Sequence, residues 1–382
     1  MERFLCIAGM LQGQEFLREC SEQGVRPTVL TLDTQRDADW PLEAIEDLAT
    51  MPAGLSRDQV LNTVCWMSRG RQFQRVIALD EADLEMAAAI REHLRIPGMG
   101  LTTAGYYRDR LAMRISARAS GFSGPDFCRV LNYDELREFM AHTPPPWELK
   151  PRARMNGRDS FRIEDAEQLW RVLDQLGDLQ SQYLLEQPLE GERFTVLSIV
   201  SERRVVFSLV LRQRVLAGGA TLVETVDRGS SDWAELVALN DSLAPSLGLV
   251  RGIAQASFAR SAEGSGYQLD EIVAGIASDR MALVTEAASG LNLWREWARM
   301  ELAHLRSANY APRACSDHYG VSLEYPAGFV AADTPELAAR EIVSRTHANG
   351  REQVIFKFGR VERGATLVAG LAARIAETAA SC

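Results

Sequence analysis

The amino-acid sequence predicts an α/β protein, in which a parallel sheet opens the chain and antiparallel strands follow in an α+β arrangement. The apolar run 3–9 precedes an amphipathic segment at 10–24, and a second apolar run follows at 26–33. Strand, helix and strand in this order are typical of a βαβ unit. Further along, the strand-like runs 183–200 and 204–215 are separated by a short polar turn, which predicts an antiparallel hairpin.

The remaining elements follow the same two patterns. The apolar run 75–80 leads into a helical segment at 81–98, which begins with acidic residues and ends at Pro-Gly. The stretch 147–151, WELKP, predicts a strand that a proline terminates. The runs 250–260 and 267–276 predict a second hairpin around a turn that contains glycine and serine.

Three units are expected along the chain, because 382 residues exceed what one hydrophobic core usually organises. The first unit spans residues 1–100. The second spans 101–310 and divides into 101–182 and 183–310. The third is a small α/β closing unit at 311–382. No internal repeat or low-complexity segment interrupts this order.

The composition is that of an ordinary globular protein, with 46% hydrophobic and 25% charged residues. A formal net charge of −10 disfavours a nucleic-acid partner, because phosphate backbones are bound by an excess of lysine and arginine. No apolar run is long enough to span a bilayer, and the N-terminus lacks the pattern of a cleaved leader. We therefore expect a cytoplasmic protein without nucleic-acid or membrane partners.

The common signatures of nucleotide binding and nucleophilic catalysis do not occur in the sequence. There is no Walker phosphate loop, no glycine-rich dinucleotide fingerprint, no HExxH and no GxSxG. The five histidines do not cluster, which disfavours a histidine-dependent triad, although histidines distant in sequence can still meet in a fold. The six cysteines are scattered without a CxxC pair, so neither a disulfide framework nor a zinc site is expected.

Four segments stand in a characteristic order and spacing. They are 76–127, ELKPRARMNGRDSF at 148–161, YLLEQPLEGERF at 183–194, and 252–281. In this order they resemble the ATP-grasp superfamily of carboxylate–amine ligases, over residues 1–310. The resemblance implies a Rossmann-like first unit and an ATP-grasp unit that clamps ATP between two antiparallel sheets. It also implies an acyl-phosphate intermediate, small carboxylate and amine substrates, and a homodimer.

The first site that the resemblance implies holds the phosphates of ATP. Lys150, which also counts as catalytic, stands at the end of the WELKP strand, and the loop 153–161 with Ser160 follows it. An ammonium group suits phosphate oxygens, and successive N–H groups of a small-residue loop form an anion cradle. The family's other phosphate-binding lysine corresponds here to Arg114, whose planar guanidinium carries the same charge. The alternative is that Lys150 is a solvated residue at a strand end.

The second implied site is the linker between the two halves of the ATP-grasp unit. There the Glu186 side chain or the Gln187 carbonyl would meet the adenine amino group, and the Leu189 N–H would meet the ring. The family's ribose-contacting glutamate corresponds to Arg193, with the neighbouring Glu192 as an imperfect substitute. The alternative is an ordinary charged turn between strands.

The third implied site is a Mg²⁺ site, since this ion prefers hard oxygen ligands in an octahedral array. The family's first carboxylate position is Ser257, the second is Glu271, and the asparagine position is Val273. The arginine that follows in the family falls on Gly275. Strict strand alternation would point Asp270 to the face opposite Glu271. Glu271 is therefore the one metal ligand that we expect.

Three arginines are candidates for binding a substrate carboxylate. Arg280 is the preferred one and counts as catalytic, whereas Arg251 and Arg260 stand near strand ends, where arginines are commonly solvated or paired with surface acids. Trp294 and Trp297 have helical spacing, which favours core packing over ligand stacking.

Two hypotheses follow from these observations. In the first, the protein is an ATP- and Mg²⁺-dependent ligase that forms an amide bond: Lys150 and Arg114 hold phosphates, Glu271 helps to hold the metal, and an amine attacks an acyl phosphate. In the second, a degenerate ATP-grasp protein has lost phosphoryl transfer and acts as a binding partner or hosts a metal-free reaction. The missing metal ligands favour the second hypothesis, and the retained Lys150 and linker favour the first.

Overall fold

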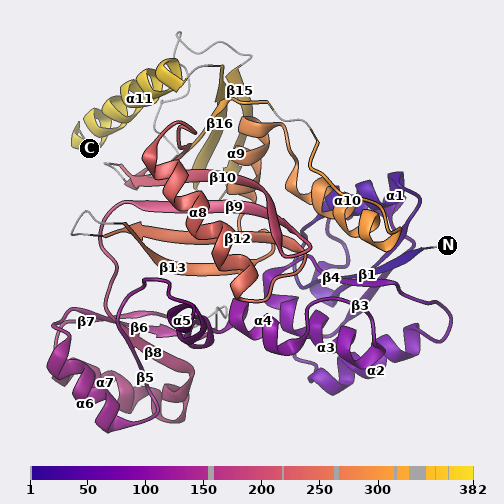
Figure 1. Ribbon diagram of the computed structural model, residues 1–382, viewed down its shortest axis with the longest axis horizontal. Coiled ribbons are helices and arrows are strands. Elements are labelled where there is room, and N and C mark those ends of the chain that lie inside the picture. The colour runs from indigo at the N-terminus through magenta and orange to yellow at the C-terminus, as the bar shows by residue number, and fades with distance from the viewer. Residues whose placement is uncertain are drawn as a thin grey trace.

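The computed structural model describes residues 2–153, 159–216, 219–261, 266–313, 316–326, 341–348, 350–359 and 361–381. The strands of these residues form three sheets (Figure 1). None of the helices in the described residues combines the length and the apolar character that a bilayer span requires. Short 3-10 turns are η1 (Asp33–Gln35), η2 (Leu42–Ala44), η3 (Glu81–Asp83) and η4 (Gly177–Gln182).

A parallel sheet organises the N-terminal part of the chain, with its strands in the order β3-β2-β1-β4. Strand β1 pairs in parallel with both β2 and β4, which confirms the predicted parallel opening. Five of the six residues of β1 are buried, as expected for a central strand between helices. The elements are β1 (Arg3–Ala8), α1 (Gln14–Glu22), β2 (Arg26–Leu32), β3 (Asp47–Met51), α2 (Arg57–Met67), β4 (Arg75–Ala78) and α3 (Leu84–Leu94).

A small antiparallel sheet follows, with its strands in the order β5-β8-β6-β7. Helices α6 and α7 cover it, and its core is a cluster of buried side chains separate from the other cores, around Leu136, Leu149 and Leu185 (Figure 1). The small sheet is therefore a compact body of its own. Its elements are β5 (Phe127–Arg129), α6 (Tyr133–His142), β6 (Trp147–Pro151), β7 (Phe161–Ile163), α7 (Ala166–Leu176) and β8 (Tyr183–Glu186), preceded by α4 (Leu101–Arg108) and α5 (Arg110–Ala119).

The largest sheet has eight strands in the order β13-β12-β9-β10-β11-β14-β16-β15. The β9–β10 and β12–β13 pairs are antiparallel, so both predicted hairpins are present. The run predicted at 183–200 is divided, however, because residues 183–186 form β8 of the small sheet and only the part from Arg193 onward pairs with β10. Strand β14 pairs with β11, so the hydrogen bonding of the large sheet continues across residue 310. The unit boundary predicted at that residue stays a prediction. The strands are β9 (Arg193–Ser201), β10 (Arg204–Val215), β11 (Thr221–Thr225), β12 (Gly252–Arg260), β13 (Tyr267–Ala274), β14 (Tyr319–Pro326), β15 (Ile342–Ala348) and β16 (Arg351–Phe358).

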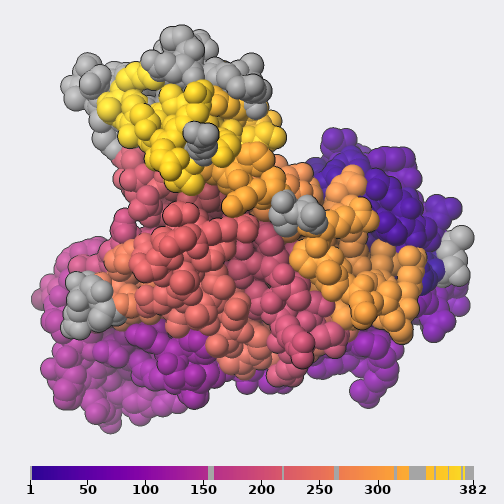
Figure 2. Space-filling model, turned by 45° about the horizontal axis from the view of Figure 1, so that its top comes forward, coloured from indigo at the N-terminus to yellow at the C-terminus, as the bar shows by residue number. Residues whose placement is uncertain are grey.

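Helices join the large sheet to the N-terminal part. Helix α8 crosses one face of the large sheet, and α10 packs against α1 (Figure 1). Figure 2 shows the orange segment around α10 directly against the indigo N-terminal residues. The two main hydrophobic clusters each contain residues from both parts, so these parts share their cores. The helices are α8 (Ser231–Ser246), α9 (Asp279–Ser289), α10 (Leu293–Leu305) and α11 (Val361–Ser381).

A buried carboxylate fastens α1 to α10. Glu19 is 1% exposed and accepts hydrogen bonds from Arg299 Nε at 2.8 Å and from Arg295 Nη1 at 3.2 Å. Burial alone would raise the pKa of Glu19, but its polar partners, Arg299 foremost, hold that pKa below its usual range. The ion pairs therefore compensate a charge that the hydrophobic surroundings would otherwise disfavour.

Removing this carboxylate should destabilise the contact between α1 and α10. Glu19→Ala removes the buried carboxylate that Arg295 and Arg299 share, although Arg299 keeps Glu296. Since breaking a buried ion pair costs about 3–5 kcal/mol of unfolding free energy, we expect a loss near the lower end of this range. Glu22→Ala is the matched control: Glu22 also pairs with Arg295, but its side chain is 55% exposed. We expect a loss of at most about 1 kcal/mol for the control, measured by urea unfolding. Equal losses in the two variants would contradict this account.

Candidate functional site

Strand β6 presents Lys150 toward the large sheet. Alternate residues of the strand, Trp147, Leu149 and Pro151, are buried, whereas Glu148 and Lys150 lie on the other face and are partly exposed. The Lys150 ammonium lies 2.5 Å from Glu148 Oε2 and 2.7 Å from Glu186 Oε1. The predicted phosphate-binding lysine is therefore paired with two carboxylates of its own sheet.

Glu186, the last residue of β8, is the centre of this cluster. It is 1% exposed, and its two oxygens accept hydrogen bonds from Arg114, Nε at 3.1 Å and Nη2 at 3.4 Å, besides the contact with Lys150. Burial would raise the pKa of Glu186, but Arg114 and Lys150 lower it by more, so it lies below its usual range. Burial likewise would lower the pKa of Lys150, but Glu186, Asp270 and Glu148 raise it by more.

Helix α5 carries the arginines that connect the small sheet to the large one. Arg114 donates to the Leu269 carbonyl at 2.8 Å and lies 3.7 Å from Asp270 Oδ1. Arg110, one helical turn earlier and on the same face, lies 3.2 Å from Glu271 Oε1 and donates to the Pro151 carbonyl at 2.8 Å. Two arginines of one helix thus contact both sheets in one region. We call this region the seam: it comprises Arg110 and Arg114 of α5 with their partners in the two sheets, together with Lys150.

A β-bulge corrects the expectation about Asp270. Ser257 pairs with Glu271 and Phe258 with Leu269, so Asp270 is an extra residue in β13 and strict alternation fails there. Its carboxylate accepts a hydrogen bond from Arg193 at 2.9 Å, in addition to its ion pair with Arg114. Asp270 therefore joins the seam, on which the sequence pattern had not placed it.

The positions implied for a metal lie side by side but carry few suitable oxygens. Ser257 faces Glu271 across the β12–β13 pair and lies 3.4 Å from the Thr195 hydroxyl, while Val273 supplies no ligand. The Glu271 carboxylate is paired with Arg110. Within the described residues, no group of three or more histidine, cysteine or acidic side chains is arranged to hold a metal. This donor set does not fit a Mg²⁺ site built by the protein.

The linker after Glu186 connects the small sheet to the large one. The Gln187 N–H donates to the Asp126 carbonyl at 2.9 Å, and the Leu189 carbonyl accepts from Arg193 at 2.5 Å. Glu192 is exposed and lies 3.3 Å from Arg260. The adenine and ribose contacts assigned to this linker stay predictions.

The phosphate loop is described only at its two ends. Ser160 is exposed, and residues 154–158 of the predicted loop lie outside the described residues.

Arg280 occupies a different place from the Lys150 cluster. Its guanidinium donates to the Thr221 hydroxyl at 2.7 Å, to the Ser322 hydroxyl at 2.9 Å and to Glu324 at 2.9 Å, which binds it to β11 and β14. Burial lowers the pKa of Arg280. The structure thus brings Lys150, Arg114 and Glu186 together and places Arg280 among strand residues of the large sheet.

Sequence reasoning missed three members of the seam. Glu148 stands two residues before Lys150 in a strand, so period-two alternation would have placed both on one face. Arg110 stands four residues before Arg114, a helical spacing that would have paired them. Asp270 carried no such signal, because a bulge depends on how β12 and β13 pair.

Comparison with known proteins gives matches of two kinds. No protein-family model matches the chain. Over 232 residues the chain is 22% identical to the L-arginine-specific L-amino acid ligase of Bacillus subtilis, a match that covers 58% of this chain and 56% of that protein. The chain thus spans little more than half the length of that curated relative.

Solved structures match over nearly the whole chain. The L-amino acid ligase from Bacillus licheniformis covers 97% of both chains (14% identity, TM-score 0.71). The match with the N5-carboxyaminoimidazole ribonucleotide synthetase from Thermus thermophilus covers 96% of both chains, with 16% identity and a TM-score of 0.70. The match with the N5-carboxyaminoimidazole synthetase from Staphylococcus aureus, complexed with ADP, covers 97% of both chains, with 12% identity and a TM-score of 0.71. The chain therefore has the ATP-grasp fold, as its segment order predicted.

The pH dependence of stability tests the role of Glu186. A carboxyl whose pKa is lowered on folding contributes stability that is present above its unfolded pKa, about 4.3, and is lost as pH falls through the folded value. Glu186→Gln should therefore cost about 3 kcal/mol at pH 7, and its difference from the parent should shrink below about pH 4.

Urea unfolding at a series of pH values measures this difference. Glu190→Gln is the matched control, because Glu190 is exposed and belongs to the same linker. Its unfolding free energy should follow that of the parent at every pH. A constant gap between the parent and Glu186→Gln down to about pH 2.5 would show that charge plays no part in the effect.

Proposed function

We propose that the protein is an ATP-dependent ligase that joins a small carboxylic or amino acid to an amine. The observation that carries the proposal is Lys150, which projects from the end of β6 into the seam between the two sheets of an ATP-grasp fold. The likeness to an L-arginine-specific L-amino acid ligase supports L-amino acids, with L-arginine first, as the substrates to test.

The proposed reaction has two steps. A carboxylate oxygen of the acid attacks the γ-phosphorus of ATP, ADP leaves, and an acyl phosphate forms. The amine nitrogen then attacks the acyl carbon, phosphate leaves, and the nitrogen loses a proton to give an amide. The protein contributes mainly by positioning the reactants and by stabilising the charge of the phosphates.

Lys150 and Arg114 would have different parts in this reaction. The Lys150 side chain is 21% exposed, so a phosphate can replace a carboxylate beside it, whereas Arg114 is 3% exposed. Arg114 would then orient Glu186 and the linker rather than contact ATP. Lys150 is one of only two lysines among the 42 basic residues of the chain, so the compact ammonium stands out at this position.

The residues at the metal positions do not fit a protein-built Mg²⁺ site, and no step of the proposal passes through one. This feature favours the second candidate function, a protein that uses the same cleft without phosphoryl transfer. Ser257 and Val273 replace ligands, and the remaining Glu271 is held by Arg110. The two candidates differ in whether ATP is consumed.

Calorimetric titration with ATP tests the nucleotide site, with and without Mg²⁺. We expect binding in the micromolar range, about −8 kcal/mol. Lys150→Met should weaken this binding by about 10- to 100-fold, because a hydrogen bond to a charged group is lost. Lys357→Met is the matched control, since Lys357 is exposed in β16 and should leave the affinity unchanged.

Turnover separates the two candidate functions. Release of ADP and phosphate that depends on an added amino acid, together with an amide product, would support the ligase. ATP binding without any turnover across the common L-amino acids would favour the non-catalytic alternative. The absence of ATP binding under all conditions would overturn the ligase proposal.

A further inference from the structure

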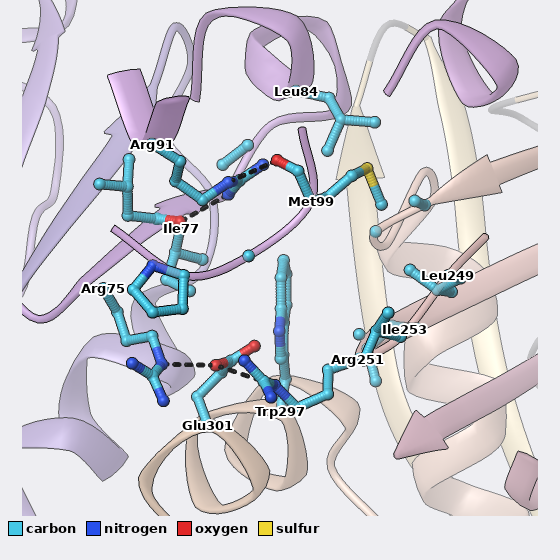
Figure 3. A pocket seen from close by; sticks show the side chains of 18 of the residues that line it. Arg75, Ile77, Leu84, Arg91, Met99, Leu249, Arg251, Ile253, Trp297 and Glu301 are labelled. Carbon is cyan, nitrogen blue, oxygen red and sulfur yellow. Dashed lines mark hydrogen bonds and ion pairs between the residues drawn. The ribbon is translucent and has the colours of Figure 1, made fainter. Parts of the chain in front are cut away.

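A cavity of about 300 Å³ lies between the N-terminal part and the large sheet (Figure 3). Its walls come from β4, from α3 and the turn after it, from the segment that leads into β12, from the end of β13 and from α10. This volume is at the lower end of the range for small-molecule sites. The cavity therefore has room for a ligand of modest size.

Most of the wall is apolar. Figure 3 shows Leu84 and Met99 near the top of the cavity, Leu249 and Ile253 on one side, and the indole ring of Trp297 standing upright at its base. Such a lining suits a hydrocarbon body and gives water few partners.

Arg91 places a guanidinium in this apolar surrounding. It is 7% exposed, and it donates from Nε to the Met99 carbonyl at 2.8 Å and from Nη1 to the Val76 carbonyl at 2.7 Å. Among the described residues, its third nitrogen, Nη2, has no hydrogen-bond partner. Burial lowers the pKa of Arg91 to about 10, as expected for a cation that no carboxylate of the described residues contacts directly.

A glycine allows this arrangement. A Cβ on Gly98 would lie 2.5 Å from Arg91 Cδ, and the residue has φ +153°. The backbone can therefore pass closely over the arginine, so that the Met99 carbonyl reaches Nε.

Two more donors on the cavity wall lack hydrogen-bond partners within the described residues. They are Nε of Arg251 and Nε1 of Trp297. Glu301 is the one carboxylate on the wall, and it is shared between Arg75, at 3.1 Å, and Arg251, at 3.8 Å. Three arginines and one glutamate thus line the cavity, and Arg251 has a second partner outside the wall, Glu202 at 3.1 Å.

We propose that this cavity binds a small organic anion, a monocarboxylate with an apolar body, whose oxygens accept hydrogen bonds from Arg91 Nη2 and from Trp297 Nε1. The class follows from the surroundings: the free groups are all donors, the charge is positive, and the remaining wall is apolar. An amine would meet no unused acceptor among the groups named above. A neutral ligand would leave the charge of Arg91 uncompensated.

The cavity is separate from the Lys150 seam. The cavity involves Ala274, the last residue of β13, and Gly275 after it, whereas Glu271 belongs to the seam, roughly 13 Å from Gly275 along an extended chain. A ligand here would contact the N-terminal part and the large sheet together. It would therefore stabilise their packing by mass action, without any need for ATP.

Titration of the full-length protein with octanoate tests the proposal, in the absence of ATP and Mg²⁺. Because Trp297 lines the cavity, saturable binding should change the tryptophan fluorescence, and calorimetry gives the affinity and the stoichiometry. Octanamide has the same chain without the charge, and it should bind at least about tenfold more weakly. Octanoate should also raise the melting temperature. Since no nucleotide is present, failure of the ligase proposal leaves this result unaffected.

Three variants identify the site. Arg91→Gln should weaken octanoate binding by about tenfold or more and octanamide binding by clearly less, because the amide oxygen accepts a hydrogen bond but carries no charge. Leu84→Phe should weaken both, because the larger ring fills the cavity without touching the charge. Arg95→Gln is the matched control, since Arg95 is exposed at the end of the same helix and does not line the cavity.

Three results would overturn the inference. One is the absence of saturable octanoate binding up to about 10 mM, which would mean that the cavity holds water only. Another is equal affinity for octanoate and octanamide. The third is unchanged octanoate affinity in folded Leu84→Phe, a variant that remains informative even where Arg91→Gln fails to fold.

Discussion

The Glu186 carboxylate, held between Lys150 and Arg114, is the interaction on which the joining of the small sheet to the large one depends. Glu186 ends a strand of the small sheet, and Arg114 belongs to the helix that also bonds to the bulged strand β13 of the large sheet. A buried carboxylate at this point is costly without partners, so each cation is fixed in place by the charge that it compensates. Two sheets with largely separate cores are thereby held in one relative position.

The ion pairs of Lys150 define what a phosphate would have to displace in the proposed function. The small sheet has its own hydrophobic core, so the ionic contacts of Arg114 and Arg110 are a large part of what fixes its position against the large sheet. A phosphate that approaches Lys150 competes with Glu148 and Glu186 for the same ammonium. In the proposed function, the affinity for ATP would be the difference between two ion-pair arrangements, and it would depend on the carboxylates as much as on the lysine.

Local periodicity was sufficient to predict much of the fold. The buried run of β1 and the β9–β10 hairpin follow from patterns within a few residues, and both are confirmed. The bulge at Asp270 and the pairing of Arg110 with Glu271 depend on contacts between segments far apart in the chain, which no local pattern encodes. The segment order predicted the ATP-grasp fold, but not that the cations expected to bind phosphate would be neutralised by carboxylates.

The two ends of strand β13 show how differently a buried arginine can be used. At the seam, Arg114 meets Glu186 and Asp270, so its charge is satisfied within the protein and serves to join the sheets. In the cavity beside the other end, Arg91 bonds to two carbonyls and, within the part of the chain that the structure describes, touches no carboxylate, and most of the wall around it is apolar. Carbonyl oxygens orient a guanidinium but carry only partial charge, so they compensate a full cation incompletely. A structural arginine needs an internal counter-charge, and Arg91 Nη2 has no partner among the described residues, which is an argument for a ligand rather than for packing.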